Sequence, residues 1–505
     1  MPAIQSILYQ HRPKNIALVV LSILFLPLDS LIFILALLSD FLVPSSSHGR
    51  REAANFDPSF TPKTVLVTGV GMSKGLALAR SFYEAGHNVI GADFDRNASG
   101  RVSKAISLFY TLKKPSAKSG STAYIEGLLE VVLTNKVDLW VSCSGVASAV
   151  EDGEAKEIVE ARTSCKAIQF DVSTTQTLHE KDSFIARTKQ LGLNVPDTHT
   201  IMTAVAAEKA LREAPANRKY IMKPVGMDDA SRGDLSLLPK ATEQDTARHL
   251  SGLRISEKSP WILQQFIEGR EYCTHSVVIK GRVRAFVACP SAELLMHYEP
   301  LAPDSKLSQA MLKFTQRYAS AGGEGFTGHL SFDFMVEQKQ VDALSKGQQH
   351  EEPVMYPIEC NPRAHTADVL FNGMSGLTNA YLSVLDDLPP SKTVDSSKVD
   401  DGSMVLPERN NRYYWVGHDL VELIIIPMLS LLFFQPDASI AKVSQGMMTF
   451  VDHLLHWQDG TFERWDPAPW WWLYHVYWPM QFVNALKTGK RWSRINVSTT
   501  KVFEC

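Results

Sequence analysis

The sequence predicts an α/β domain built on a parallel sheet, followed by an α+β domain, with membrane-associated segments toward both ends. A buried-strand run, a glycine-rich turn, a run with helical spacing and a second strand occupy residues 64–93, which is typical of a βαβ unit. Short apolar strands that end in charged residues follow between 219 and 363. Residues 16–43 are strongly apolar, and residues 470–478 are rich in aromatic side chains.

Composition limits the class of protein. The chain has 505 residues, 45% of them hydrophobic, which is a globular rather than a disordered composition. The net charge of −3 gives no basic balance to favour nucleic acid as a partner. None of the 6 cysteines forms a C-x-x-C pair, so the spacing predicts reduced thiols in a cytosolic environment.

Composition shifts divide the chain into four regions. We expect an N-terminal apolar anchor with a linker over 1–60 and a domain on the first βαβ unit over 61–160. A larger α+β domain would then fill 161–388, and a Pro-, Ser- and Asp-rich stretch introduces an aromatic-rich region over 389–505.

The N-terminal apolar run is too long for the 7–15-residue core of a secretory signal, so we expect membrane attachment. Pro27 and Asp29 lie at its midpoint, and each half would span roughly 20 Å as a helix. That is short of a hydrocarbon core of about 30 Å. We therefore predict a hairpin or in-plane anchor on the cytosolic face, turning at residues 27–30, with the C-terminal aromatics on the same surface. A single N-terminal span is the alternative.

The glycine-rich turn over 69–75 lies between a strand at 64–68 and a helical run at 76–85. In a Rossmann unit such glycines let the backbone approach a pyrophosphate, and Asp93, at the end of the next strand, would bind a ribose. This pattern alone fits an NAD(P)-dependent oxidoreductase. We interpret the unit mainly as a scaffold. The alternatives are an NAD(P) site and a contribution to an acceptor pocket, in which residues 142–148 would form a strand-end loop.

A polar cluster ends the strand at 355–363. Glu359, Asn361 and Arg363 alternate with apolar residues, so on an extended backbone they share one face. Asp333 is the single acid of an earlier strand at 331–336. Carboxylate and amide oxygens suit Mg²⁺, and an arginine can hold a phosphate with two hydrogen bonds. The two strands together predict a site for Mg²⁺ and nucleotide phosphates.

These motifs resemble those of the ATP-grasp ligases. Residues 359–363 (ECNPR), coming after 332–334 (FDF), look like the metal-binding end of that fold. Residues 258–271 (KSPWILQQFIEGRE), 273–276 (CTHS) and 361–365 (NPRAH) are similar to the mycosporine-glycine synthase-like branch, and the likeness covers nearly the whole chain. The resemblance implies a Rossmann-like pre-ATP-grasp domain followed by an ATP-grasp domain.

The resemblance also implies roles for individual residues. Asp333, Glu359 and Asn361 would bind the metal, Lys181 and Lys223 would hold the nucleotide phosphates, and Arg363 would act in catalysis together with Lys223. The linker residues Gln265, Phe266 and Ile267 would contact adenine, and Glu268 and Glu271 would lie near the ribose. His275, His365 and Arg232 are weaker candidates for substrate contacts, and a core role for His275 stays open.

The activity implied is an ATP- and Mg²⁺-dependent (or Mn²⁺-dependent) carbon–nitrogen ligase of secondary metabolism. ATP would activate an oxygen of a small-molecule acceptor, and an amino acid amine would displace the phosphate. The resemblance implies 4-deoxygadusol and glycine as substrates. The alternative is an amino acid–carboxylate ligase of a fungal-type alkaloid pathway. An NAD(P)-dependent oxidoreductase is a more remote alternative. A non-catalytic membrane scaffold is the third.

Overall fold

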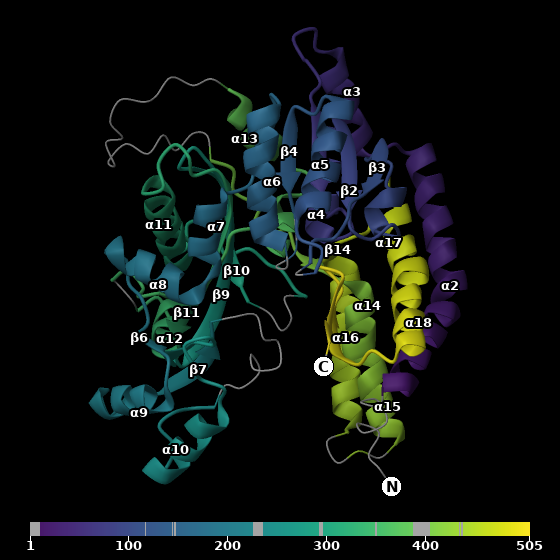
Figure 1. Cartoon of the computed structure of the whole chain (residues 1–505). Coiled ribbons are helices and arrows are strands. Elements are labelled where there is room, and N and C mark those ends of the chain that lie inside the picture. The colour runs from purple at the N-terminus through teal and green to yellow at the C-terminus, as the bar shows by residue number, and fades with distance from the viewer. Residues whose placement is uncertain are drawn as a thin grey trace.

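A computed structural model describes residues 11–116, 118–143, 145, 148–225, 236–291, 296–348, 351–386, 404–433, 435 and 438–504. A parallel α/β unit, an antiparallel α+β unit and a helical C-terminal module pack together, and the N-terminal helix lies along that module (Figure 1). The predicted order of α/β followed by α+β structure is confirmed.

The first unit is a five-stranded parallel sheet in the order β3-β2-β1-β4-β5. Its strands alternate with helices, as the βαβ pattern predicts. The strands are β1 (Thr64–Thr68), β2 (Asn88–Asp93), β3 (Leu108–Thr111), β4 (Leu139–Ser142) and β5 (Lys166–Ile168), and the helices are α4 (Ser73–Glu84), η1 (Ser99–Val102), α5 (Thr122–Asn135) and α6 (Ala149–Arg162).

The second unit has two antiparallel sheets. A three-stranded sheet, β6-β8-β7, consists of β6 (Thr198–Ile201), β8 (Trp261–Gln265) and β7 (Tyr220–Pro224). A four-stranded sheet, β10-β9-β11-β12, consists of β10 (Arg282–Pro290), β9 (Gly269–Ile279), β11 (Gly328–Glu337) and β12 (Tyr356–Asn361). The turn between β9 and β10 has φ of 50° at Lys280 and 72° at Gly281, a left-handed pair that suits a tight hairpin.

Short helices flank these two sheets. Helix α11 (Lys306–Ser320) forms because its apolar side chains recur at helical spacing against the sheet. The helices of this unit are α7 (Val172–His179), α8 (Lys181–Gln190), α9 (Ala204–Glu213), α10 (Glu243–Gly252), α11 (Lys306–Ser320), α12 (Gln338–Ser345), η5 (Thr366–Phe371), α13 (Ser375–Leu382) and η6 (Ser383–Leu385).

A buried acid of the C-terminal module, Asp466, is hydrogen-bonded to the unit that contains the parallel sheet. The carboxylate of Asp466 accepts hydrogen bonds from Arg80 Nε at 3.0 Å, Ser103 Oγ at 2.6 Å and the Lys104 amide at 2.8 Å. The module comprises β13 (Tyr413–Tyr414), α14 (Val416–Asp419), the π-helical η7 (Leu420–Ile425), α15 (Ile426–Leu432), α16 (Ile440–His456), β14 (Gln458–Asp459), α17 (Ala468–Trp472), the π-helical η8 (Leu473–Tyr477), α18 (Trp478–Thr488), β15 (Trp492–Asn496) and β16 (Lys501–Glu504).

The N-terminal segment is one continuous helix, α2 (His11–Leu42), so the predicted hairpin with its turn at 27–30 is wrong. Pro27 lies inside the helix without ending it. A lone carboxyl is costly in an apolar helix, but Asp29 Oδ2 lies 2.9 Å from His475 Nε2 of η8. A partner nearly 450 positions away in the chain satisfies this acid, so a solvated turn is unnecessary.

The predicted linker also contains regular structure. Residues 46–56 form α3 (Ser46–Phe56), which docks on α4 because Arg50 pairs with Glu84. The guanidinium of Arg51 lies 4.1 Å from the centre of the Tyr83 ring and donates to the Tyr83 carbonyl.

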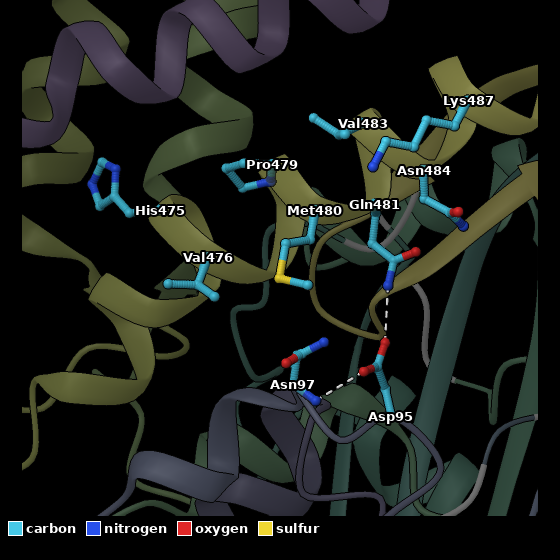
Figure 2. Close-up of a pocket in the computed structure, with 10 residues that line it drawn as sticks. All are labelled: Asp95, Asn97, His475, Val476, Pro479, Met480, Gln481, Val483, Asn484 and Lys487. Carbon is cyan, nitrogen blue, oxygen red and sulfur yellow. Dashed lines mark hydrogen bonds between the residues drawn. The ribbon is translucent and has the colours of Figure 1, made fainter.

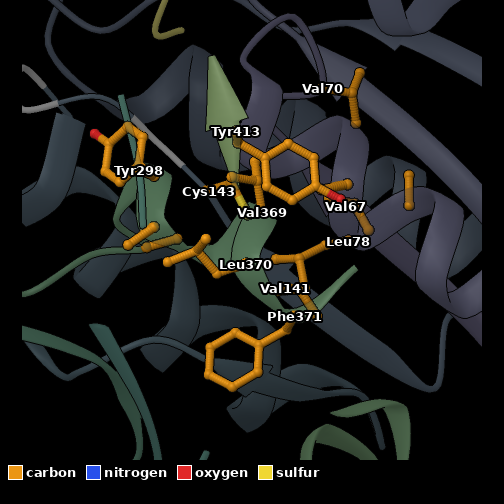
Figure 3. Packing of buried hydrophobic residues seen from close by; sticks show 14 of the residues in the cluster. Val67, Val70, Leu78, Val141, Cys143, Tyr298, Val369, Leu370, Phe371 and Tyr413 are labelled. Carbon is orange, nitrogen blue, oxygen red and sulfur yellow. The ribbon is translucent and has the colours of Figure 1, made fainter. Parts of the chain in front are cut away.

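One hydrophobic cluster joins all three units. Figure 3 shows Val67, Val141 and Leu78 of the parallel sheet's unit packed beside Val369 and Leu370 of η5, with Tyr413 of the C-terminal module against them. Because these side chains are buried together, the ends of the strands in different units are held at fixed positions.

Candidate functional site

The two predicted acidic strands lie side by side. In the antiparallel register of β11 and β12, Asp333 is opposite Glu359 and Ser331 is opposite Asn361. An irregularity in the pairing follows Asp333, and on its other side Asp333 is opposite Cys273 of β9. The structure therefore brings the three predicted metal ligands to one place on the sheet.

A chain of hydrogen bonds orders this polar group. Asn361 Nδ2 donates to Asp333 Oδ2 at 3.0 Å, and Arg363 Nη2 donates to Asn361 Oδ1 at 2.8 Å. Burial, and next the negative charges of Glu359 and Glu271, raise the pKa of Asp333 well above its usual value. A divalent cation would relieve this repulsion, so the donor set fits Mg²⁺.

Both predicted phosphate lysines face the acidic strands. Lys181, the first residue of α8, places Nζ 3.9 Å from Glu359 Oε2. Lys223 of β7 donates to Gln264 Oε1 at 3.0 Å. Burial, and next the charge of Lys181, lower the pKa of Lys223 to about 8. Two neighbouring ammonium groups that repel each other suit a polyanion such as a nucleotide phosphate.

The predicted adenine linker, residues 265–268, connects β8 to β9. The amides of Gln265 and Phe266 already donate to the carbonyls of Asp197 and Lys219, each at 2.7 Å. The carbonyl of Glu268 accepts from the Gln338 amide at 3.1 Å. These bonds fix the backbone of the linker on both sides of Ile267.

His275 and His365 lie deep in the protein, behind Arg363. His275 Nε2 is 3.3 Å from Asp368 Oδ1, and its Nδ1 accepts from the His365 amide at 3.3 Å. His365 Nδ1 in turn accepts from the Ala367 amide at 3.2 Å, which caps η5. Burial, and next the charge of His275, lower the pKa of His365 well below its usual value. Both histidines therefore belong to a buried network, which agrees with the core interpretation.

Lys74 was not singled out from the sequence, and it connects the two units at the site. It lies in the first turn of α4, is fully buried, and donates from Nζ to the Ala364 carbonyl at 2.6 Å. Burial, and next the charge of Arg363, lower the pKa of Lys74 to about 7. The only sequence signal was a lysine between a glycine-rich turn and an apolar helix.

The glycine-rich turn is filled by the protein itself. Asp93 Oδ2 accepts from the Gly71 amide at 2.8 Å, so this acid faces the turn. The Ser73 amide at the start of α4 donates to the Ser498 carbonyl at 2.9 Å, and Trp415 Nε1 donates to Ser73 Oγ at 3.0 Å. The C-terminal module thus occupies the helix terminus at which a dinucleotide pyrophosphate would bind.

Two of the predicted elements are a loop that contains Arg232 and a loop that follows β4. Arg232 and its loop, residues 226–233, lie outside the described residues, as do parts of the strand-end loop over 142–148. A separate cavity of about 590 Å³ lies between the loop after β2 and α18, lined by Asp95, Gln481 and Lys487 among others (Figure 2). None of the predicted site residues lines it.

No protein-family model matches the chain, and no curated protein matches it. Among solved structures, it is similar to an L-amino acid ligase from Bacillus licheniformis at 14% identity and a TM-score of 0.42, over 69% of this chain and 78% of that one. It is similar to biotin carboxylase from Campylobacter jejuni at 16% identity and a TM-score of 0.47, over 70% and 74%. It is also similar to an N5-carboxyaminoimidazole synthetase from Staphylococcus aureus, complexed with ADP, at 15% identity and a TM-score of 0.45, over 65% and 79%.

Proposed function

We propose that this protein is an ATP- and Mg²⁺-dependent ligase of the ATP-grasp type, which activates an acceptor oxygen and joins it to an amine. The observation that carries the proposal is the meeting of Asp333 and Glu359 across paired strands, with the ammonium of Lys181 3.9 Å from Glu359. Two carboxylates, an amide, an arginine and two lysines at one strand end match the charges of a metal–nucleotide complex.

Each side chain has a distinct task in this proposal. Asp333, Glu359 and Asn361 hold the metal, which neutralises phosphate charge when bound. Lys181 and Lys223 hold the nucleotide phosphates, and Arg363 is fixed by Asn361 beside the transferring group. Phosphoryl transfer needs mainly positioning and charge neutralisation, and these groups supply both.

The acceptor receives the terminal phosphoryl group of ATP on an oxygen, releasing ADP. An amine then forms the C–N bond and expels that oxygen as inorganic phosphate. The sequence resemblance favours 4-deoxygadusol with glycine. An amino acid joined to another carboxylate is the second candidate, because the same chemistry applies to an acyl phosphate.

The oxidoreductase alternative is disfavoured by the glycine-rich turn. Its amide at Gly71 is bonded to Asp93, and its helix start is bonded to Ser498. A bound dinucleotide would have to displace both groups.

The experiment is ADP release measured over a matrix of amino acids and acceptors, with mass detection of the product. We expect ADP formation that needs Mg²⁺ and both substrates, and a product mass equal to the two substrates less water. No ADP with any pair, together with saturable stabilisation by NAD(P)H, would reject the ligase in favour of the oxidoreductase.

We further propose that the protein lies on a membrane surface rather than crossing it. One face of α2 is exposed and apolar, and it includes Leu24, Leu28, Leu31, Leu35 and Leu38. The helix is long and apolar enough to cross a bilayer by length and composition. Further exposed apolar side chains lie on α15 and α16, namely Met428, Leu432, Ile440, Met448, Val451 and Leu455.

The opposite face of α2 is bonded to the C-terminal module. Asn15, Ser22 and Asp29 recur every seven residues, and they bond Trp492 Nε1, the Tyr474 carbonyl and His475 respectively. Figure 1 shows α2 and α18 running side by side. Because α18 carries Gln481 and Lys487 at a cavity, surrounding this pair of helices with hydrocarbon would be costly. Insertion of the apolar face into one leaflet buries the exposed leucines and leaves the polar face of α2 and α18 in water.

The test is flotation with phosphatidylcholine vesicles. Replacing Leu24 and Leu35 with Glu should release the protein from the vesicles, because both side chains point outward. Val205→Glu, an exposed apolar position on α9, is the matched control and should still float. Equal flotation of all three proteins would contradict the proposed surface.

A further inference from the structure

A second cluster of ligating side chains lies where the loop after β10 meets the C-terminal module, among residues that the proposed ligase chemistry does not use. His297 Nε2 lies 2.8 Å from Asp419 Oδ1, and His453 Nδ1 lies 2.5 Å from Asp419 Oδ2. One ligating atom from each residue lies within 4.8 Å of the others. Within the described part of the chain, these are the three His, Cys, Asp or Glu side chains whose ligating atoms lie this close together.

We propose that His297, Asp419 and His453 form a binding site for a divalent transition metal of the zinc class. Two imidazole nitrogens and one carboxylate oxygen are ligands that Zn²⁺ prefers, and a fourth position remains for water or another ligand. Mg²⁺ and Ca²⁺ prefer oxygen ligands, so the histidines separate this site from the one at Asp333 and Glu359.

Side-chain rotation is needed for the geometry to hold an ion. Ligands at about 2.0–2.1 Å in a tetrahedral arrangement lie roughly 3.4 Å apart. The two His–Asp contacts, 2.8 and 2.5 Å long, are roughly 0.6 and 0.9 Å shorter than this and involve different oxygens of Asp419, so both imidazoles would rotate outward to admit an ion. The Asp419 side chain is fully buried, and that of His297 is 30% exposed, so the site is enclosed yet open to entry from one side.

The surroundings fix the two imidazoles. The Trp457 ring lies 4.7 Å from the His453 ring and 5.9 Å from the His297 ring, and Tyr414 lies 5.6 Å from His453. Aromatic walls of this kind restrict ring rotation and exclude water, which strengthens a preorganised metal site.

The three ligands come from three separate elements. His297 belongs to the loop after β10, Asp419 ends α14, and His453 lies near the end of α16. The neighbouring residue Tyr298 pairs with Tyr413 through two backbone hydrogen bonds of 2.9 Å. A bound ion would therefore cross-link the catalytic sheet to the C-terminal module, which is a structural role and not a step in phosphoryl transfer.

The experiment measures metal on the full chain, purified without chelator and then dialysed against Zn²⁺ or Co²⁺ alone. We expect about one Zn²⁺ retained per chain and a tetrahedral visible absorption spectrum with Co²⁺. His297→Asn and His453→Asn should each weaken Zn²⁺ binding by more than about 100-fold, because each removes a direct ligand. His297 is the safer variant for folding, since its side chain is partly exposed.

The matched control is His456→Asn on the same helix, where an exposed imidazole pairs with Asp452 at 2.9 Å. This variant should keep full Zn²⁺ binding, and so should Glu359→Gln, which separates this site from the proposed catalytic metal. A chain that retains no Zn²⁺, or retains it equally in the His297 and His456 variants, would overturn the site and leave a hydrogen-bonded His–Asp–His contact.

Discussion

The glycine-rich turn after β1 and the polar end of β11 and β12 are two strand ends that suit phosphate, and they differ in what covers them. At the turn, the amide of Gly71 is bonded to Asp93 and that of Ser73 to Ser498. At the polar end, the Glu359 side chain is 34% exposed, and Lys181 faces it. A helix terminus binds an anion only where no part of the protein has already satisfied its amides.

The largest expected effect is at the polar end. Glu359→Gln removes a charge at similar volume, and we expect ADP formation to fall by about 10²–10³ because a principal charge-stabilising group is lost. Steady-state ADP release at saturating Mg²⁺ measures this. Glu352→Gln, exposed and paired with Lys313 in the segment that leads to β12, is the control. If Glu359→Gln keeps more than about a tenth of the activity, Glu359 is not a direct ligand of the metal.

Lys223→Met should raise the KM for ATP by roughly 10–100-fold, the value of a charged hydrogen bond, with little change in the KM for the amine. The pKa of Lys223, lowered to about 8, adds a pH test. The ammonium is present below pH 8 and lost above it, so the KM for ATP should rise with pH through this range. Lys219→Met, exposed and just before the same strand, should keep the wild-type profile. An equal rise for both substrates would place Lys223 away from the phosphates.

Gly75→Ala should destabilise the protein by about 1–3 kcal/mol, because the added methyl would meet the backbone oxygen of Gly69 at 2.4 Å. Urea unfolding measures the loss. The folded fraction should keep its KM for ATP, since the turn serves packing. Gly252→Ala, with no heavy atom within 4 Å, should change stability by less than that. A rise in the KM for ATP without a loss of stability would mean that the turn binds nucleotide.

Ser498→Ala should have the smallest effect, lowering the free energy of unfolding by about 0.5–1.5 kcal/mol. It removes the hydrogen bond from Ser498 Oγ to Asn496 Oδ1, 2.7 Å long, but leaves the carbonyl that caps α4. Thermal unfolding with and without NAD(P)H measures it, with the exposed Ser493→Ala as the reference. Saturable NAD(P)H stabilisation of the variant would show that the turn is only weakly covered.

Local pattern predicted much of the polar end. Alternation placed Glu359, Asn361 and Arg363 together because a strand has a period of two, whereas the register that sets Asp333 opposite Glu359 came only from the structure. Position in space could not be predicted where partners are distant in sequence. The pairing of Asp29 with His475 and the grouping of His297 with Asp419 and His453 both join residues far apart in the chain, so local pattern revealed neither.

The polar face of α2, which bonds the C-terminal module, affects how the chain folds during translation. His11 bonds the Ala485 carbonyl at 3.0 Å, and Asn15 bonds Trp492 at 3.1 Å, contacts that join positions 474 and 477 residues apart. During translation the polar face of α2 emerges without its partners, which follow only after almost the whole chain has been made. We predict that a membrane or a chaperone binds the nascent helix throughout that interval. Crosslinking of stalled nascent chains at Ser22, on the polar face, would detect that contact, which should be lost once the C-terminal module packs on α2.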